Sequence, residues 1–238
     1  MQNKNIIVVT GGSGRFAQSL KKTKSKYKFI YPSKNLLNIT NLNSIKKFLK
    51  KVRPKSVLHL AGLSSPMIQH DKNIAKSINL NIVGTANLVN ICSQLKIKLI
   101  YFSTSYVYPG KKGNYKEYDP VLPWNNYAWS KLGGECAVQM YNNSLILRVC
   151  MTERPFIHKK AFANVKLNFI FHDAVAKILV KILNKKGIIN VGGPAKTVYN
   201  FAKKYNPAIK KKFIKKKSPN NFPLKSSMNL SKLNKILK

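Results

Sequence analysis

The chain is poor in acidic residues. Its 238 residues include 6 Asp and Glu against 44 Lys and Arg, which gives a formal net charge of +38. Such a field attracts polyanions and opposes compaction through self-repulsion. Nucleic-acid binding and a solvated lysine coat are the two interpretations.

Arginine is also scarce, and this decides between the two interpretations. Arg15, Arg53, Arg148 and Arg154 are its only occurrences, and the lysines are spread along the whole chain. Arginine is the usual reader of bases and phosphates. We therefore favour the solvated coat over a nucleic-acid partner.

Paired cysteines and long apolar runs are missing as well. Cys92, Cys136 and Cys150 are odd in number and form no CxxC motif. This pattern indicates buried, reduced thiols in a cytoplasmic protein, and we expect no metal site. No apolar run reaches the roughly 18 residues of a membrane span. The N-terminus leads directly into a strand, so we expect neither a membrane partner nor a signal peptide.

Strand-like and helix-like segments alternate over the first 150 residues, and 44% of the chain is hydrophobic. Short apolar runs rich in β-branched residues predict strands, and apolar residues at helical spacing predict helices. Strands are predicted at 5–10, 27–32, 56–62, 98–105 and 144–149, and helices at 17–22, 41–52, 78–95 and 127–141. Continuous apolar strands alternating with helices indicate a doubly wound α/β domain, the Rossmann fold, over residues 1–150.

Residues 151–238 predict a small substrate-binding lobe that is partly integrated with the first domain. They contain a clear helix at 172–183, a short strand at 187–191 and a helix near 197–205. The lysine-rich stretch 209–217 fits either an edge strand or a loop.

The stretch TGGSGRFA, residues 10–17, lies where the first strand turns into a helix. Gly11 permits the tight turn, and Gly14 lets a pyrophosphate approach the backbone. The N-terminus of the helix adds free N–H groups and a partial positive charge. Ala17 stands at the third glycine of the usual dinucleotide fingerprint, a mild departure.

The end of the second strand reads IYPSKN and carries no acid. NAD-binding folds tend to place Asp or Glu here, where it accepts hydrogen bonds from the ribose. Ser33 and Lys34 would instead suit a 2′-phosphate, although Lys34 also fits a plain surface lysine. We therefore favour NADP, with NAD as the alternative.

Tyr127 and Lys131 in YAWSK are four residues apart and share one face of a predicted helix. A nearby ammonium favours the phenolate, which lowers the pKa of a tyrosine from about 10. Such a tyrosine can exchange a proton with a substrate oxygen. Ser103, Thr104 and Ser105 lie at the end of the strand predicted at 98–105 and offer a hydroxyl. A lone Y-x-x-x-K is weak in a lysine-rich chain, so the order of the motifs carries the interpretation.

That order resembles the extended short-chain dehydrogenase/reductase family of nucleotide-sugar epimerases and reductases. The segments that carry the resemblance are VTGGSGRFA, VLHLAG, NLNIVGTANLVNIC, LIYFSTSYVY, YAWSKLGGE, LILRV and INVGG. They occur in family order over most of the chain and are together highly specific. The resemblance implies an NAD(P) cofactor, a nucleotide-sugar substrate and a homodimer built through the helices at 78–95 and around Tyr127. The segment MNLSKLNKIL near the end resembles the closing segment of the family, from which we expect the chain to be complete.

The resemblance also implies roles for individual residues. Tyr127 would be the acid/base, Thr104 would hydrogen-bond the reacting oxygen, and Lys131 would tune Tyr127 and hold the nicotinamide ribose. The other implied cofactor contacts are Gly11, Gly14, Arg15, Phe16, Ser33, Lys34, Asn38, Ile39, Ala61 and Gly62, with Asn38 standing where the family has Asp. The implied substrate contacts are Ser64, Thr104, Ser105 and Arg154, with Lys159 or Lys160 as further candidates.

The segment STSYVYPGKKGNY favours a reductase. Dehydratases of the family follow the threonine with an Asp-Glu pair, and here Ser105 and Tyr106 stand there. The segment resembles dTDP-4-dehydrorhamnose reductase-like proteins, although these have Asp at Ser105. We expect NAD(P)H-dependent reduction of a 4-keto nucleotide sugar. An NAD-dependent epimerase and a non-catalytic cofactor-binding regulatory protein stay open.

His59, His172, Trp124 and Trp129 are given no chemical role. His59 is expected to be packed within a strand, His172 to lie beside a helix cap, and the tryptophans to form wall or core.

Overall fold

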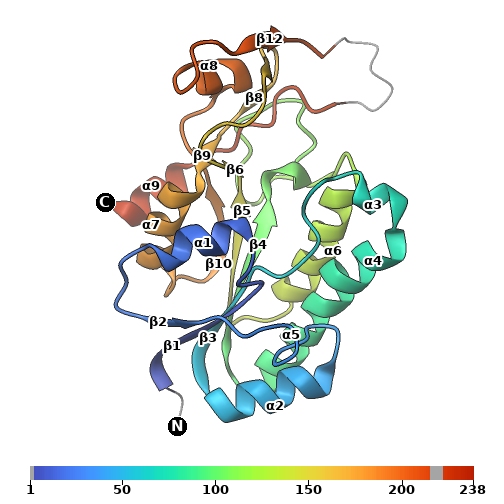
Figure 1. Cartoon of the computed structure of the whole chain (residues 1–238), viewed down its shortest axis with the longest axis vertical. Helices are drawn as coiled ribbons and strands as arrows, with labels where there is room; N and C mark the ends of the chain where they lie inside the picture. The colour runs from blue at the N-terminus through green and yellow to red at the C-terminus, as the bar shows by residue number, and fades with distance from the viewer. Residues whose placement is uncertain (1–2, 215–221) are drawn as a thin grey trace.

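A central parallel sheet organises the protein. The structure is a computed structural model and describes residues 3–214 and 222–238. The strands of the sheet are β1 (Asn3–Thr10), β2 (Lys28–Ile30), β3 (Pro54–His59), β4 (Lys98–Thr104), β5 (Ser144–Val149) and β10 (Gly187–Val191). Their order is β10-β5-β4-β3-β1-β2 (Figure 1). From β1 the order of the strands runs one way to β2 and the other way to β3, β4, β5 and β10. The predicted doubly wound α/β fold is therefore confirmed.

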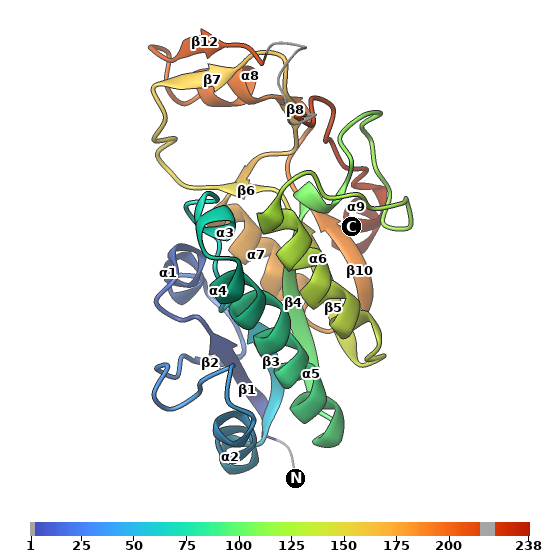
Figure 2. The same ribbon diagram turned by 90° about the vertical axis from the view of Figure 1, so that its right-hand side faces the viewer.

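Helices cover both faces of this sheet (Figure 2). On one face lie α1 (Arg15–Lys21), α7 (His172–Ile182) and α9 (Ser231–Leu237), and on the other lie α2 (Leu42–Val52), α5 (Gly84–Gln94) and α6 (Asn126–Gln139). Ile7 and Val9 join the core on the α1 side, whereas Val8 joins the core on the α5 side. Successive strand residues point to opposite faces, which is why both faces of each central strand are apolar.

The helix predicted at 78–95 is longer and irregular. It comprises α4 (Ile74–Ile78), the π-helical turn η1 (Asn79–Val83) and α5, and it follows the short helix α3 (Gln69–Lys72). Within η1, the side chain of Asn81 donates to the carbonyl of Leu63 and accepts from its N–H. A π-turn often marks a functional site, and this one packs against α6 beside the candidate site.

A small lobe lies beyond the carboxyl ends of the strands (Figure 1). Its short strand pairs are β6 (Met151–Thr152) with β9 (Ile170–Phe171), β7 (Lys160–Phe162) with β12 (Lys210–Lys212), and β8 (Lys166–Leu167) with β11 (Lys196–Thr197), next to α8 (Val198–Lys203). These two- and three-residue strands are too short to show a periodicity in the sequence. The predicted helix at 172–183 and strand at 187–191 are confirmed as α7 and β10, and both belong to the central body.

The lysine-rich stretch 209–217 contains β12, which pairs with β7, so its described part includes a strand. Residues 215–217 of the stretch lie outside the described residues.

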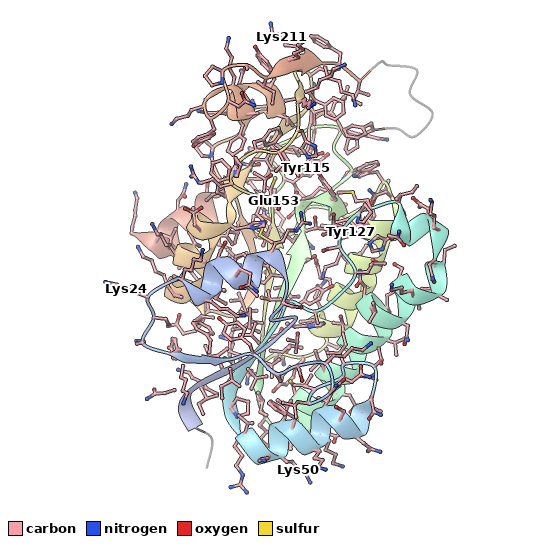
Figure 3. The ribbon with its side chains drawn as sticks, in the orientation of Figure 1. Lys24, Lys50, Tyr115, Tyr127, Glu153 and Lys211 are labelled. Atoms are coloured by element: carbon pink, nitrogen blue, oxygen red, sulfur yellow. The ribbon has the colours of Figure 1, made fainter. Side chains whose placement is uncertain are left out.

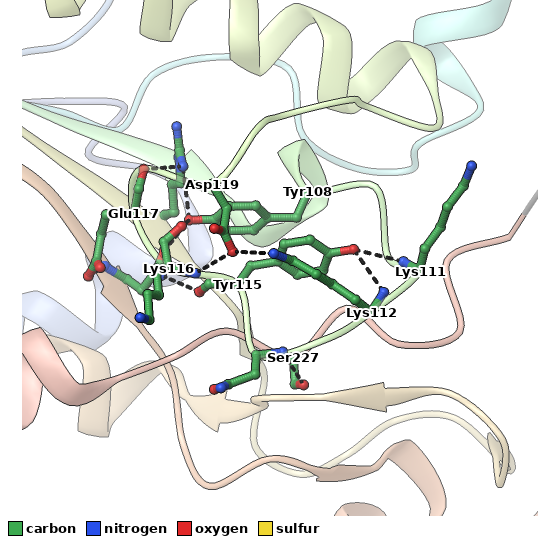
Figure 4. A network of polar contacts seen from close by, with 11 residues as sticks. Tyr108, Lys111, Lys112, Tyr115, Lys116, Glu117, Asp119 and Ser227 are labelled. Atoms are coloured by element: carbon green, nitrogen blue, oxygen red, sulfur yellow. Dashed lines mark hydrogen bonds and ion pairs between the residues drawn. The ribbon is translucent and has the colours of Figure 1, made fainter.

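The loop after β4 is tied down by polar contacts (Figure 4). It begins with the 3-10 turn η2 (Ser105–Val107). Tyr108 stacks on Tyr115 with 4.9 Å between ring centroids. The Tyr115 hydroxyl accepts from the N–H groups of Lys111 and Lys112 at 2.8 and 3.1 Å, and the Tyr115 N–H donates to the carbonyl of Ser227 at 3.0 Å. The segment after Thr104 is therefore fixed to the C-terminal part of the chain.

Gly134 sets the distance between α6 and η1, and it gives a stability prediction. A Cβ at this position would lie 2.5 Å from the carbonyl oxygen of Asn81, whereas a Cβ at Gly133 would meet side-chain atoms of Ile82, the nearest at 2.8 Å. We expect Gly134→Ala to lower the free energy of unfolding by about 1–3 kcal/mol, because backbone cannot move aside cheaply. Gly133→Ala is the matched control and should cost less, since a side chain yields more easily than backbone and alanine favours helix. Equal urea-unfolding midpoints for the two variants would contradict this account.

Candidate active site

The carboxyl ends of β1 and β3 form the base of the candidate site. Gly11 follows β1 with φ of +73°, and a Cβ there would lie 2.6 Å from the backbone nitrogen of Ala61. The hydroxyl of Thr10 accepts a hydrogen bond from the Ala61 N–H at 3.2 Å. The two chain segments therefore touch where the sheet order reverses, which is the place where such sheets bind ligands.

The glycine loop leads into α1, whose N-terminus faces this point. Gly14 is the N-cap residue and offers no side chain to the first N–H groups of the helix. Its own N–H donates to the carbonyl of Gly11 at 3.0 Å, which closes the loop. The uncapped N–H groups and the helix dipole favour an anion here.

A cleft of about 410 Å³ runs from this loop to the small lobe. The predicted site residues on its wall are Gly11, Gly14, Arg15, Phe16, Gly62, Ser64, Thr104, Ser105, Tyr127 and Lys131. Figure 3 shows Tyr127 on the α6 side and Glu153 on the α1 side of this region. Residues from both halves of the chain thus converge on one cleft.

Thr104, Tyr127 and Lys131 form a compact group in that cleft. Thr104 ends β4, and Tyr127 and Lys131 lie one turn apart on α6. A hydrogen bond between the side chains of Thr104 and Tyr127 lowers the pKa of Tyr127, but burial has the larger effect and raises it above its ordinary value. The effect of Lys131 on Tyr127, which the sequence pattern predicts, stays a prediction.

Lys131 is held by its surroundings on α6 and β4. Its ammonium lies 4.1 Å from the centroid of the Tyr101 ring, whose hydroxyl donates to the Lys131 carbonyl at 2.9 Å. Burial lowers the pKa of Lys131 to about 7, and the carboxylate of Glu135 partly opposes this shift. Lys131 is therefore close to changing its charge at neutral pH.

Glu135 is fully buried one turn beyond Lys131. Its carboxylate accepts from Arg148 Nε at 3.1 Å and Nη2 at 2.6 Å, and from the Ser103 hydroxyl at 2.5 Å. Ser103 directly precedes Thr104 in β4. One carboxylate thus fixes α6, β4 and β5 relative to one another.

Several predicted residues lie away from the cleft wall. Ser33 and Lys34 are exposed in the turn after β2. The side-chain oxygen of Asn38 accepts from the N–H and the hydroxyl of Thr40 at 3.1 and 2.9 Å, and Ile39 is buried in the core.

Arg154 lines a neighbouring cleft between α1 and α7, which it shares with Arg15. Its guanidinium carbon lies 3.9 Å from the centroid of the Phe171 ring.

The sequence pattern missed two side chains beside the site. Glu153 forms an ion pair with Arg15, and both residues line the cleft. Its available signal was an acid four residues after the strand predicted at 144–149, in a chain with so few acids. His70 is buried on α3 with its ring centroid 5.2 Å from that of Tyr127. Its Nδ1 lies 2.6 Å from the hydroxyl of Ser77. A single histidine in an irregular segment gave no signal.

His59 is packed inside the sheet, as expected. Its Nδ1 lies 2.8 Å from the Thr10 hydroxyl and its Nε2 lies 3.0 Å from the Thr85 hydroxyl. Burial and then the charge of Lys131 lower the pKa of His59 to about 3. The ring therefore stays neutral and links β1 with α5.

Other classes of site receive no support from the described ranges. No group of three or more His, Cys, Asp or Glu is placed to hold a metal ion within residues 3–214 and 222–238. In the same part of the chain, no helix is long and apolar enough to cross a membrane. Cys150 lines the cleft, but burial raises its pKa to about 11, so it is a poor nucleophile.

Residues 4–165 match the model of the RmlD substrate binding domain family. The chain belongs to this family. A dTDP-4-dehydrorhamnose reductase of Aggregatibacter actinomycetemcomitans is 25% identical over 198 residues, which cover 79% of this chain and 62% of that protein. The methionine adenosyltransferase 2 subunit beta of Xenopus laevis is 31% identical over 119 residues, 50% of this chain and 35% of that protein. The matched regions thus span less than two thirds of these relatives.

Solved structures of dTDP-4-dehydrorhamnose reductases share the fold of this RmlD-family chain. A dTDP-4-dehydrorhamnose reductase of Bacillus anthracis, solved in complex with NADP, superposes with a TM-score of 0.86 at 21% identity, covering 97% of this chain and 92% of that one. A hypothetical dTDP-4-dehydrorhamnose reductase of Sulfolobus tokodaii gives 0.83 at 24% identity, covering 100% and 95%. The resemblance inferred from the motifs is confirmed.

The position of Glu135 predicts two linked effects of Glu135→Gln. The variant leaves Arg148 buried beside a neutral amide, so we expect the free energy of unfolding to fall by about 3 kcal/mol. It also removes a charge that raises the pKa of Lys131. In competitive acylation, which detects the neutral amine, the midpoint for Lys131 should lie near pH 7 in the parent protein and lower in the variant.

Asp119→Asn is the control for this prediction. It removes one negative charge from an ion pair with Lys112, on the loop after β4. It should leave the Lys131 midpoint in place. An unchanged midpoint in Glu135→Gln would show that Glu135 does not act on Lys131.

Proposed function

We propose that this chain is an NADP(H)-dependent reductase of a 4-keto nucleotide sugar. The observation that carries the proposal is the convergence of Thr104, Tyr127 and Lys131 on one cleft with the glycine loop of β1 and α1. Family membership and the reductases among its relatives support it. The small lobe would cover the sugar nucleotide, since it lies over the same end of the sheet.

The residues present fit a dinucleotide cofactor. Gly11 and Gly14 leave no Cβ in the way of a pyrophosphate, and the uncapped start of α1 offers N–H groups to it. No acid lies in the turn after β2, while Ser33 and Lys34 are exposed there and free to meet a 2′-phosphate. The B. anthracis reductase, whose fold this chain shares, was solved with NADP. NADP is therefore favoured over NAD.

A nicotinamide bound in the cleft would supply the hydride for C4 of the sugar. Tyr127 would donate a proton to the carbonyl oxygen, and Thr104 would orient that oxygen through its hydroxyl. Because burial holds the pKa of Tyr127 above its ordinary value, the tyrosine is protonated at neutral pH and ready to act as the acid. Lys131 would bind the ribose hydroxyls in the ammonium form.

A second candidate is a cofactor-binding subunit of another enzyme. The relatives include several proteins named methionine adenosyltransferase 2 subunit beta. Such a subunit would need the glycine loop but not the proton donor. Turnover by the parent protein and its loss in a Tyr127 variant separate the two candidates.

Tyr127→Phe tests the proton donor. We expect NADPH affinity to change by less than about twofold and kcat for 4-keto sugar nucleotides to fall by about 10²–10⁴, because only the acid is lost. Tyr118→Phe is the matched control, since Tyr118 is 78% exposed and should keep full turnover. Turnover that survives in Tyr127→Phe rules out this assignment. NADPH binding without turnover of any keto-sugar nucleotide by the parent protein favours the subunit.

Lys34→Asp tests the choice of cofactor. The new carboxylate would repel a 2′-phosphate and could accept from a ribose hydroxyl, so the NADPH/NADH affinity ratio should fall by at least about tenfold. Lys235→Asp makes the same charge change on α9, which packs against the β10 edge of the sheet. Fluorescence titration of both nucleotides gives the ratio, and equal ratios in the two variants would show that Lys34 is plain surface charge.

A further inference from the structure

A second cleft, of about 890 Å³, lies between α1 and α7 next to the candidate active site. Six of its thirteen lining residues are cations: Arg15, Lys22, Lys24, Arg154, Lys177 and Lys181. These cations lie in one concave surface, which focuses their field on an anion.

The kind of cation makes the same point. The chain has four arginines, and two of them, Arg15 and Arg154, line this one cleft. Of the other two, Arg148 is buried against Glu135, and Arg53 caps the end of α2. Arginine has the planar set of donors that matches phosphate oxygens. Arg15 and Arg154 therefore line the same cleft, where both could bind one anion.

The wall carries two carboxylates, Glu153 and Asp173, against its six cations. Across the described ranges, the ion pairs are Arg15 with Glu153, Lys112 with Asp119 and Arg148 with Glu135. The five other cations of the cleft thus have no carboxylate partner in this part of the chain. The remaining acid on the wall, Asp173, lies in the first turn of α7. Like charges gathered in a concave surface raise the local concentration of a counter-ion.

We propose that the α1–α7 cleft binds an oligophosphate and that this site is coupled to the cofactor cleft. The wall offers cations and the polar side chains of Gln18, Ser19 and Thr23, and its one ring is His172. It therefore suits phosphate groups and has no aromatic stack for a base. Oligophosphate binding does not depend on the proposed reductase chemistry, whereas the coupling rests on the dinucleotide binding proposed for the first cleft.

Coupling follows from shared residues. Arg15, Glu153 and His172 line both clefts. Arg15 begins α1, where a cofactor pyrophosphate would lie, and its ion pair with Glu153 stands between the two spaces. Two anions that share one arginine repel each other, so oligophosphate in the second cleft weakens dinucleotide binding in the first. By linkage, the dinucleotide weakens oligophosphate binding by the same factor.

The direct test is calorimetric titration of tripolyphosphate into the full chain at two salt concentrations. Lys177 and Lys181 are exposed, one turn apart on α7, and line only the second cleft. We expect Lys177→Ala/Lys181→Ala to weaken binding about tenfold. The matched pair is Lys46→Ala/Lys50→Ala, exposed at the same spacing on α2 (Lys50 is labelled in Figure 3). It should weaken binding by less than about twofold.

Three results of this titration would overturn the site. Absence of saturable binding is the first, and equal weakening by the two lysine pairs, which indicates general charge attraction, is the second. The third uses ATP as a comparison ligand. Affinity for ATP close to that for tripolyphosphate supports recognition of phosphate alone, whereas affinity more than about tenfold higher rejects it in favour of a base-binding pocket.

The coupling is tested by NADPH titration with and without tripolyphosphate. We expect tripolyphosphate to raise the apparent Kd of NADPH in the parent protein and in Lys46→Ala/Lys50→Ala, but not in Lys177→Ala/Lys181→Ala, which should bind NADPH normally. A rise that persists in the α7 variant would show that tripolyphosphate competes at the glycine loop. That outcome, or no rise in any protein, overturns the coupling.

Discussion

The buried ion pair between Glu135 and Arg148 is the contact on which the candidate site depends most. Arg148 also donates to the Tyr108 hydroxyl at 2.9 Å and to the Glu117 carbonyl at 3.0 Å. The Tyr108 hydroxyl in turn lies 2.9 Å from the side-chain oxygen of Asn190, which is in β10. The network therefore joins α6, β4, β5, β10 and the loop under the lobe. Loss of one partner would leave a buried charge without compensation, and the positions of Thr104, Tyr127 and Lys131 would relax together.

Five of the six acids form a specific polar contact. Glu135, Glu153 and Asp119 form ion pairs, Glu117 accepts from the Asn190 N–H, and Asp71 accepts from the side chain of Asn126 beside Tyr127. Most are placed where they join elements distant in the sequence. The lysines, by contrast, lie mainly on the surface and repel one another. In this protein the acids therefore mark contacts between distant elements more often than the far more numerous lysines do.

Much of the fold could be predicted from the sequence, because strands buried on both faces appear as continuous apolar runs. The runs at 5–10 and 144–149 fall within or match β1 and β5. Local motifs also brought Gly14, Thr104 and Tyr127 to one cleft. What could not be predicted depends on partners distant in the sequence. Tertiary packing, which no local pattern encodes, sets three features. They are the ring of Tyr101 beside Lys131, the burial that governs the pKa of Tyr127 and the position of Arg154 in a second cleft.

The π-turn η1 has a consequence for how the helix from Ile74 to Gln94 tolerates change. One surplus residue in a helix rotates the part before it by about 100° relative to the part after it. The two ends of this helix are therefore out of phase, with Ile74 and Ile78 exposed while Leu88 and Ile91 are buried on the sheet. A single-residue deletion between 79 and 83 would restore an unbroken α-helix. It would also turn α4 about its axis and carry the histidine on α3 away from the tyrosine of α6.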